Sequence, residues 1–376
     1  MRDPSFTLGI EEEYLLVDRQ SRDLVVDPPP GLMAACEKAT DGRVSPEFLR
    51  SQVEVATGVC RSVEEAARQM QDLRRAVAGV AADYGLGIIA ASSHPFANIG
   101  QQLPTQQERY TGIARDLQAV GRRLVISGLH VHVGLDDDDL RIDLMSQVAY
   151  FTPHLLALST SSPFWAGEDT GLKSYRVAVF TELPRTGTPE IFESWGEYKR
   201  HLDILVKAGL IEDGTKIWWD LRPSARFPTL ELRLTDICTT LADGISIAAI
   251  YLCLLHMLWR LKRGNQRWRR YAAMLVRENR WRAQRYGIDE GLVDFGKGEI
   301  VSFATLLEEI IDLTEHDAAV LGCADEIKWS RQILKRGTSA HRQLAVYRQA
   351  LDAGADKPEA LRRVVDFLLE ESLAGT

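Results

Sequence analysis

Cysteines are few in this sequence, and none lies in a metal-binding or redox spacing. The 376 residues contain no C-x-x-C pair, and the five cysteines are scattered: Cys36, Cys60, Cys238, Cys253 and Cys323. Thiolate zinc sites and redox dithiols need closely spaced pairs. The spacing therefore argues against both, and it favours reduced thiols in the cytoplasm.

Long apolar runs and an excess of positive charge are also missing. The most apolar segment, Ile245–Trp259, is about fifteen residues long, whereas a helix that crosses a bilayer needs about 20. The first residues lack the basic and then apolar layout of a signal peptide. The formal net charge is −8, which gives no electrostatic case for nucleic acid. We expect a cytoplasmic protein without a membrane or nucleic-acid partner, and a core helix at Ile245–Trp259.

The short motifs of nucleotide binding and covalent catalysis are absent as well. The sequence has no GxxxxGK[ST], no GxGxxG and no GxSxG, which argues against a P-loop, a Rossmann site and a nucleophile elbow. The composition is ordinary, with 45% hydrophobic and 26% charged residues, and it supplies ample material for a core. Any chemistry must come from residues that the fold brings together.

Several strand-like segments carry polar residues two positions apart. A β-strand alternates its side chains between two faces, so residues i and i+2 point the same way. The segment Phe6–Asp18 places Glu11 and Glu13 on one face and Glu12 on the other. Four further pairs have apolar neighbours: Gln52 and Glu54, His130 and His132, Asp220 and Arg222, and Glu231 and Arg233.

These pairs have two interpretations. In the first, each strand turns a solvated edge to water and each histidine is only structural. In the second, the strands share one sheet, which packs its apolar face on helices and forms a metal-binding floor on the other. A solvated face would carry Thr, Lys and Ser, so the repeated Glu and His favour the second. Carboxylates with few imidazoles and no thiolate indicate Mg²⁺ or Mn²⁺, and the arginines suit a phosphoryl group.

The order of the elements predicts an α+β fold. Strand patterns alternate with helices in the first two-thirds of the chain, and the chain beyond Asp236 is mainly helical. Helix patterns cover residues 62–84, 106–124, 136–155 and 195–208. Residues 159–189 have little regular pattern, which is typical of a functional loop. We expect a single domain, 1–376, with a catalytic sheet at about 6–236 and a mainly helical portion at 237–376.

Seven motifs follow one another along the chain: FTLGIEEEYLLVD, VEVATG, SSHPF, GLHVHVG, SSPFWAGEDTG, WWDLRPSARFPTLELRLTD and ENRWRAQRYG. Together they resemble the bacterial carboxylate–amine ligases of the glutamate–cysteine ligase type 2 family. The resemblance implies a fold similar to glutamine synthetase and the guanidino kinases, in which a curved, largely antiparallel sheet forms a funnel with helices on its outer face. It also implies ATP-dependent joining of a carboxylate to an amine, with weak glutamate–cysteine ligase activity.

The resemblance implies a role for each matching residue. The expected metal ligands, for Mg²⁺ or Mn²⁺, are Glu11, Glu13, Glu54, His130 and Glu231. The expected catalytic residues are Arg233, as a phosphate-binding group, with Arg222 and His132. His132 has two open roles, as a metal ligand or as a group that stabilises phosphate. The expected contacts to substrate or nucleotide are Arg226, Asn279 and Arg280.

The implied partners are small molecules, namely a glutamate-like carboxylate and a cysteine-like amine, and the family suggests a homodimer or a larger assembly. Two alternatives stay open. One is a phosphotransferase that moves phosphate to a guanidino or amine group, and the other is a regulatory relative that binds ATP and Mg²⁺ without catalysis. The metal-floor interpretation makes a structural prediction: the five expected ligands converge on one cavity, and Glu12 stays outside it.

Overall fold

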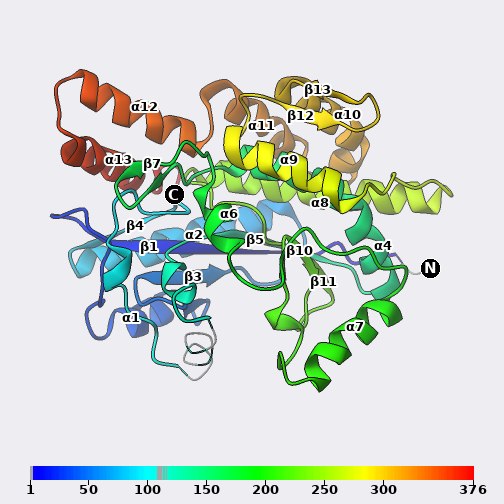
Figure 1. Ribbon diagram of the computed structural model, residues 1–376, viewed down its shortest axis with the longest axis horizontal. Helices are drawn as coiled ribbons and strands as arrows, with labels where there is room; N and C mark the ends of the chain where they lie inside the picture. The colour runs from blue at the N-terminus through cyan, green and yellow to red at the C-terminus, as the bar shows by residue number, and fades with distance from the viewer. Residues whose placement is uncertain (1–2, 108–111, 113–114, 116) are drawn as a thin grey trace.

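A seven-stranded antiparallel sheet forms the centre of the protein. The computed structural model describes residues 3–107, 112, 115 and 117–376 (Figure 1). The strands follow the order β10-β11-β5-β1-β3-β2, and β4 also pairs with β1. Their bounds are β1 Leu8–Asp18, β2 Val44–Pro46, β3 Gln52–Ala56, β4 Leu86–Ile89, β5 Leu129–Gly134, β10 Leu221–Pro223 and β11 Thr229–Leu232. The antiparallel sheet and the α+β class are as predicted.

Strand β1 lies between β3 and β5 and sets the register of the sheet. Glu11 lies opposite His130 on β5, and Glu13 lies opposite Glu54 on β3. Burial alternates along β1 as the sequence pattern predicts: Glu12 is fully buried on the helix-covered face, whereas Glu11 and Glu13 are half-buried on the other. The acidic residues of the cavity face are therefore brought together by strand pairing, not by chain proximity.

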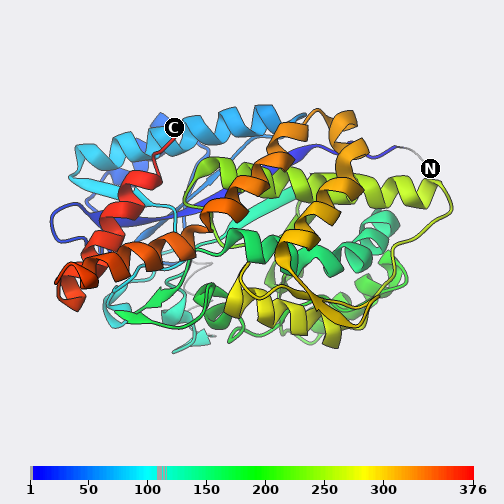
Figure 2. The same ribbon diagram turned by 90° about the horizontal axis from the view of Figure 1, so that it is seen from above.

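Two helices cover the apolar face of the sheet. Helix α2 (Val63–Asp83) and helix α8 (Leu241–Arg263) contact each other, and they also contact β1 and β5, respectively. Figure 2 shows α2 in light blue and α8 in yellow-green, running alongside each other over the strands. Helix α2 begins after Ser62, whose hydroxyl accepts a hydrogen bond from the Glu65 backbone N–H at 3.1 Å. This hydrogen bond caps the first turn of the helix, as is typical of a serine at this position.

Helix α8 is longer than the sequence pattern suggests. It has 23 residues and extends beyond the apolar segment Ile245–Trp259 at both ends. Within the described part of the chain, it is the one helix whose length and composition would allow it to cross a membrane. However, 94% of its most apolar window is buried inside the protein. Burial of this kind is typical of a core helix, which is the role that we expected for Ile245–Trp259.

The remaining helices lie around this centre. Figure 1 shows the chain beyond β11, yellow to red, gathered along the upper side, while α7 lies at the lower edge. The helices are α1 Leu32–Ala39, α4 Asp138–Val148, α5 Thr152–Ser159, α6 Tyr175–Phe180, α7 Trp195–Lys207, α9 Ala273–Tyr286, α10 Phe303–Leu321, α11 Ala324–Arg336, α12 Ser339–Asp352 and α13 Lys357–Glu371. Three small sheets join β6 Phe164–Trp165 to β7 Glu168–Asp169, β8 Thr186–Gly187 to β9 Trp218–Trp219, and β12 Leu292–Asp294 to β13 Glu299–Val301.

Three predicted segments differ from the structure or fall outside it. The helix expected over residues 106–124 lies partly outside the described residues, and its described end contains a short 3-10 helix, Gly121–Arg123. The segment 159–189 contains the β6–β7 hairpin and α6, so it is less irregular than expected. The strand expected to carry both Asp220 and Arg222 is interrupted at Asp220, whose backbone N–H donates to the Gly187 carbonyl. Asp220 therefore does not share the cavity face with Arg222.

Candidate active site

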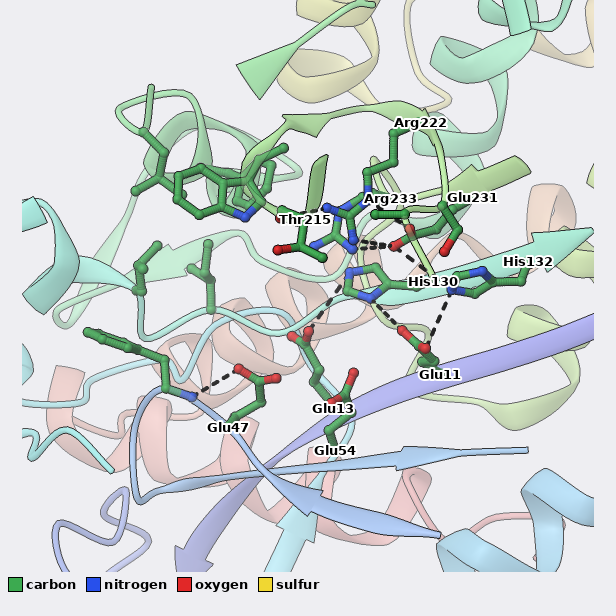
Figure 3. Close-up of a pocket in the computed structure, with 18 of the residues that line it drawn as sticks. Glu11, Glu13, Glu47, Glu54, His130, His132, Thr215, Arg222, Glu231 and Arg233 are labelled. Carbon is green, nitrogen blue, oxygen red and sulfur yellow. Dashed lines mark hydrogen bonds and ion pairs between the residues drawn. The ribbon is translucent and has the colours of Figure 1, made fainter. Parts of the chain in front are cut away.

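One cavity of about 240 Å³ opens on the face of the sheet that α2 and α8 leave uncovered. Its lining includes all five expected metal ligands: Glu11, Glu13, Glu54, His130 and Glu231. Figure 3 shows them converging from β1, β3, β5 and β11, with the two histidines between Glu11, Glu13 and Glu54 below and Glu231 with the arginines above. The predicted convergence is therefore present.

Glu12 lies on the opposite face, as the alternation predicts. Its carboxylate pairs with Arg74 of α2 at 2.7 Å, and it accepts a hydrogen bond from the Tyr14 hydroxyl at 2.6 Å. Glu12 is 1% exposed and Arg74 is fully buried. Arg74 also donates to the backbone carbonyls of Thr239 and Ser372, so this ion pair ties β1 and α2 to the C-terminal part of the chain. The role of Glu12 is structural.

Three overlapping groups of side chains on the cavity face have the geometry of metal ligands. Within each group the ligand atoms lie within 4.8 Å of one another, and the groups are Glu11, Glu54 and His130; Glu11, His132 and Glu231; and Glu13, Glu47 and Glu54. Glu11 and Glu54 each belong to two groups. Carboxylates with one imidazole match the hard, oxygen-rich coordination that Mg²⁺ and Mn²⁺ prefer. The donor set therefore fits several neighbouring divalent cations.

The electrostatics of Glu54 support this fit. Burial and the negative charges of Glu47, Glu11 and Glu13 raise the pKa of Glu54 well above its ordinary value. Among the described residues, the one side chain that donates a hydrogen bond to Glu54 is Ser45, whose hydroxyl lies at 3.0 Å. A bound divalent cation would relieve this repulsion, because it favours the ionised carboxylate.

The two histidines of β5 differ in their charge environment. His130 Nδ1 lies 3.3 Å from Glu11, but burial and the charge of Arg233 lower the pKa of His130. For His132, burial lowers the pKa, but the hydrogen bond to Glu11 and the charge of Glu231 outweigh it and raise the pKa. A neutral imidazole is the form that binds metal, so His130 is ready to act as a ligand. His132 more readily carries a proton.

Glu231 lies at the centre of an arginine cluster. Arg222 Nε donates to one carboxylate oxygen at 2.8 Å, and Arg233 Nη1 donates to the other. Burial would raise the pKa of Glu231, but the two guanidinium groups outweigh burial and hold the pKa well below its ordinary value. Arg222 is fixed further by the carbonyls of Thr215 and Ile217, at 2.9 and 3.0 Å. Glu231 therefore stays ionised, and it holds the two guanidinium groups beside the other glutamates of the cavity.

The three expected contacts to substrate or nucleotide do not lie together. Arg226 lines the cavity from the loop between β10 and β11, where it is exposed. Asn279 and Arg280, on α9, are not among the residues that line this cavity, and their expected contact to substrate or nucleotide stays a prediction. The Asn279 amide exchanges two hydrogen bonds with the Val293 backbone, at 2.7 and 2.8 Å. Arg280 pairs with the buried Asp220 at 2.8 Å, so both residues anchor α9.

Two charged residues of the cavity escaped the sequence pattern. Glu47 lies in the turn before β3, where no strand alternation marks it, and Arg176 lies on α6 within the segment 159–189. The one feature of the sequence that pointed to Arg176 was its position in the segment 159–189, which we expected to be functional. The cavity also has an apolar wall, formed by Phe48, Leu117, Leu124, Ile126, Phe180, Leu183 and Trp218.

Comparisons with known proteins agree with this architecture. The family model described as glutamate–cysteine ligase family 2 matches residues 7–366. A Rhodospirillum rubrum protein, provisionally named glutamate–cysteine ligase 2, is 60% identical over 378 residues, which cover 100% of this chain and 97% of that protein. A Jannaschia protein with the same provisional name is 52% identical, and the aligned region covers 98% of this chain and 97% of that protein.

A solved structure extends the likeness to the fold. A Francisella tularensis glutamate–cysteine ligase in complex with AMP matches with a TM-score of 0.68 at 14% identity, covering 97% of this chain and 92% of that one. At this identity the likeness concerns the fold alone. The family model and the close relatives cover nearly the whole sequence, and the chain therefore belongs to glutamate–cysteine ligase family 2.

Proposed function

We propose that the protein is an ATP-dependent carboxylate–amine ligase. The observation that carries this proposal is a single cavity in which overlapping acidic and imidazole groups lie beside the Arg222–Glu231–Arg233 cluster. Phosphoryl transfer depends on positioning and on stabilising the charge of the transferring group, and this cavity offers both. Family membership and the names of the close relatives support the same reaction class.

The proposed cofactors are ATP and Mg²⁺ or Mn²⁺. The residues that would hold the cations are Glu11, Glu13, Glu54, His130 and Glu231, with Glu47 as a further ligand on the acidic side. Bound divalent cations would supply neutralisation of the phosphate oxygens of ATP. His132, which carries a proton more readily than His130, suits a phosphate oxygen or takes a metal after losing that proton.

The chain's own residues orient the reactants and stabilise charge. In the proposed reaction, an oxygen of the substrate carboxylate attacks the γ-phosphorus of ATP and ADP leaves. Arg233, fixed by Glu231, neutralises the negative charge of the transferring phosphoryl group. The amine nitrogen then attacks the acyl carbon of the acyl phosphate, phosphate leaves with the former carboxylate oxygen, and the amine releases a proton. No protein nucleophile is required.

The proposed substrates are a glutamate-like carboxylate and a cysteine-like amine. This assignment rests on the names of the relatives and on the Francisella enzyme of the same fold. We further propose a cytoplasmic enzyme of the glutamate–cysteine ligase type, with weak activity toward these two amino acids, that works as a homodimer. We also propose that residues 1–376 form one catalytic domain.

A turnover screen tests the proposed function. Amino acids and amines are offered with ATP and Mg²⁺, then Mn²⁺, and ADP release and products are measured by coupled assay and mass spectrometry. We expect ADP release that requires both a carboxylate and an amine, and that is lost in E231A and E231Q. A phosphorylated amine as the product would favour the phosphotransferase. Binding of ATP and Mg²⁺ with no ADP release for any pair would favour the regulatory relative.

A further inference from the structure

Arg176 is a buried cation on the cavity wall, and no carboxylate of the described residues pairs with it directly. It lines the cavity and is 3% exposed. The two other buried or half-buried arginines of the lining, Arg222 and Arg233, both pair with Glu231. Within the residues that the structure describes, no carboxylate oxygen lies at ion-pair distance from Arg176. Burial of an unpaired charge costs free energy, so its position calls for an explanation.

The guanidinium of Arg176 is held in place by neutral groups. Its Nη1 donates to the Leu234 carbonyl at 2.9 Å, and its Nη2 donates to the Arg233 carbonyl at 3.1 Å. The Phe180 ring packs under it, 5.5 Å from the guanidinium carbon. Its Nε is buried and has no hydrogen-bond partner among the described residues. A guanidinium has five N–H groups, so donors remain for an incoming group.

A glycine, Gly128, leaves room for this guanidinium beside the acidic residues of the cavity. A Cβ atom on Gly128 would lie 2.5 Å from Arg176 Nη2 and 3.0 Å from His130 Nε2, so only glycine fits there without a shift. The Gly128 backbone N–H donates to Glu13 at 2.7 Å. Arg176 therefore lies beside Glu13 and His130, at one end of the proposed metal site.

The nearby negative charges compensate Arg176 only in part. Burial lowers the pKa of Arg176, and the charges of Asp236 and Glu13 oppose this effect without cancelling it. The Asp236 oxygens are already occupied, because they accept hydrogen bonds from the Ser161 backbone and from the hydroxyls of Ser162 and Ser174. An anion from outside the chain would complete the pairing.

We propose that Arg176 is the binding site for an oxyanion of a reactant, beside the Glu13–His130 end of the floor. This assignment rests on the proposed ligase function and deepens it. Two reactant groups have the required chemistry, namely the transferring phosphoryl group, which leaves as phosphate, and a carboxylate of the amino-acid substrate. A forked guanidinium binds either with paired hydrogen bonds, whereas a lysine ammonium offers only a point charge.

Anion binding to the full-length protein tests this site without turnover. Inorganic phosphate and L-glutamate are titrated separately by isothermal titration calorimetry in the presence of Mg²⁺. R176K keeps the charge and R176Q removes it. R123Q is the matched control, because it removes a partly exposed guanidinium that pairs with Glu182 and contacts Tyr175, next to Arg176, without lining the cavity.

We expect R176K and R176Q to raise the Kd of one anion by tenfold or more, while R123Q binds both as the wild type does. A loss confined to phosphate identifies the phosphoryl group, and a loss confined to glutamate identifies the substrate carboxylate. If R176Q does not fold, as thermal unfolding will show, R176K decides the question. Wild-type binding of both anions by R176K overturns the assignment. Because no turnover is measured, failure of the ligase assay leaves this result interpretable.

Discussion

Glu13 on β1 and Glu54 on β3 lie directly opposite each other, so two carboxylates face one another across one rung of an antiparallel strand pair. Like charges in this arrangement destabilise a sheet. Glu54 has the raised pKa that such repulsion and burial produce. Repulsion between these carboxylates therefore destabilises the sheet locally, at the place where the proposed cations would bind.

The first prediction concerns pH and metal. The pKa of Glu54 in the folded state lies above its ordinary value of 4.5, so its contribution to stability is full below pH 4.5 and is lost as the pH rises through the raised value. Mg²⁺ or Mn²⁺ binds the ionised form. We expect the increase in Tm on adding either cation to grow as the pH rises above 4.5, measured by differential scanning calorimetry.

The E54Q variant provides the comparison for that experiment. Glutamine removes the charge and keeps the size, so E54Q should have an unchanged or higher Tm without metal and a smaller metal-induced increase. A metal-induced increase that is the same in E54Q and in the wild type would show that Glu54 is not a ligand.

We expect substitutions of the adjacent residues Glu12 and Glu13 to have different effects, the first on stability and the second on activity. E12Q breaks a buried ion pair with Arg74, and removal of one partner of such a pair costs about 3–5 kcal/mol. E13Q removes a charge from the cavity face and should cost little stability but most of the turnover. Urea unfolding and ADP release measure the two effects. The assignment of faces fails if E13Q destabilises more than E12Q, or if folded E12Q is inactive.

The third prediction concerns the arginine beside Glu231. R233K keeps the charge but loses the fork that fits a phosphoryl group, so kcat should fall by about 10²–10³-fold. R185K is the control, because Arg185 stacks on Trp218 and does not line the cavity. Steady-state kinetics and Tm are measured for both variants. A kcat within twofold of wild type in R233K would remove Arg233 from the proposed catalytic set.

A substitution of Asn279 tests the substrate or nucleotide contact that we expected on α9. N279A breaks both hydrogen bonds to the Val293 backbone, and a buried group left unsatisfied costs about 1–3 kcal/mol. Since Asn279 lies outside the cavity, the KM for ATP should stay unchanged while the free energy of unfolding falls. An increased KM for ATP at unchanged stability would instead support the expected contact between Asn279 and the nucleotide.

The period of two was enough to predict which residues face the cavity. It places Glu11 and Glu13 together and Glu12 apart, because the strand pattern runs unbroken through Phe6–Asp18. The same reasoning failed at Asp220, which lies at the break between β9 and β10 and whose carboxylate pairs with Arg280. Periodicity describes regular strands and says nothing about where they break.

Residues outside regular strands were not predictable in this way. Glu47 reaches the cavity from a turn, and Arg176 from the short helix α6, so neither has a periodic neighbour that marks its direction. Asn279 and Arg280 were assigned through resemblance, and their side chains instead satisfy Val293 and Asp220. Such contacts depend on how distant segments pack, which one sequence does not reveal.

The most direct test of the central claim follows the carboxylate oxygen. The carboxylate substrate found in the turnover screen is labelled with ¹⁸O and incubated with the wild-type protein, ATP, Mg²⁺ and the amine, and both products are analysed by mass spectrometry. An acyl phosphate intermediate predicts an amide product and transfer of one ¹⁸O atom to phosphate for each amide formed. Unlabelled phosphate, or a phosphorylated amine in place of the amide, would contradict the proposed reaction.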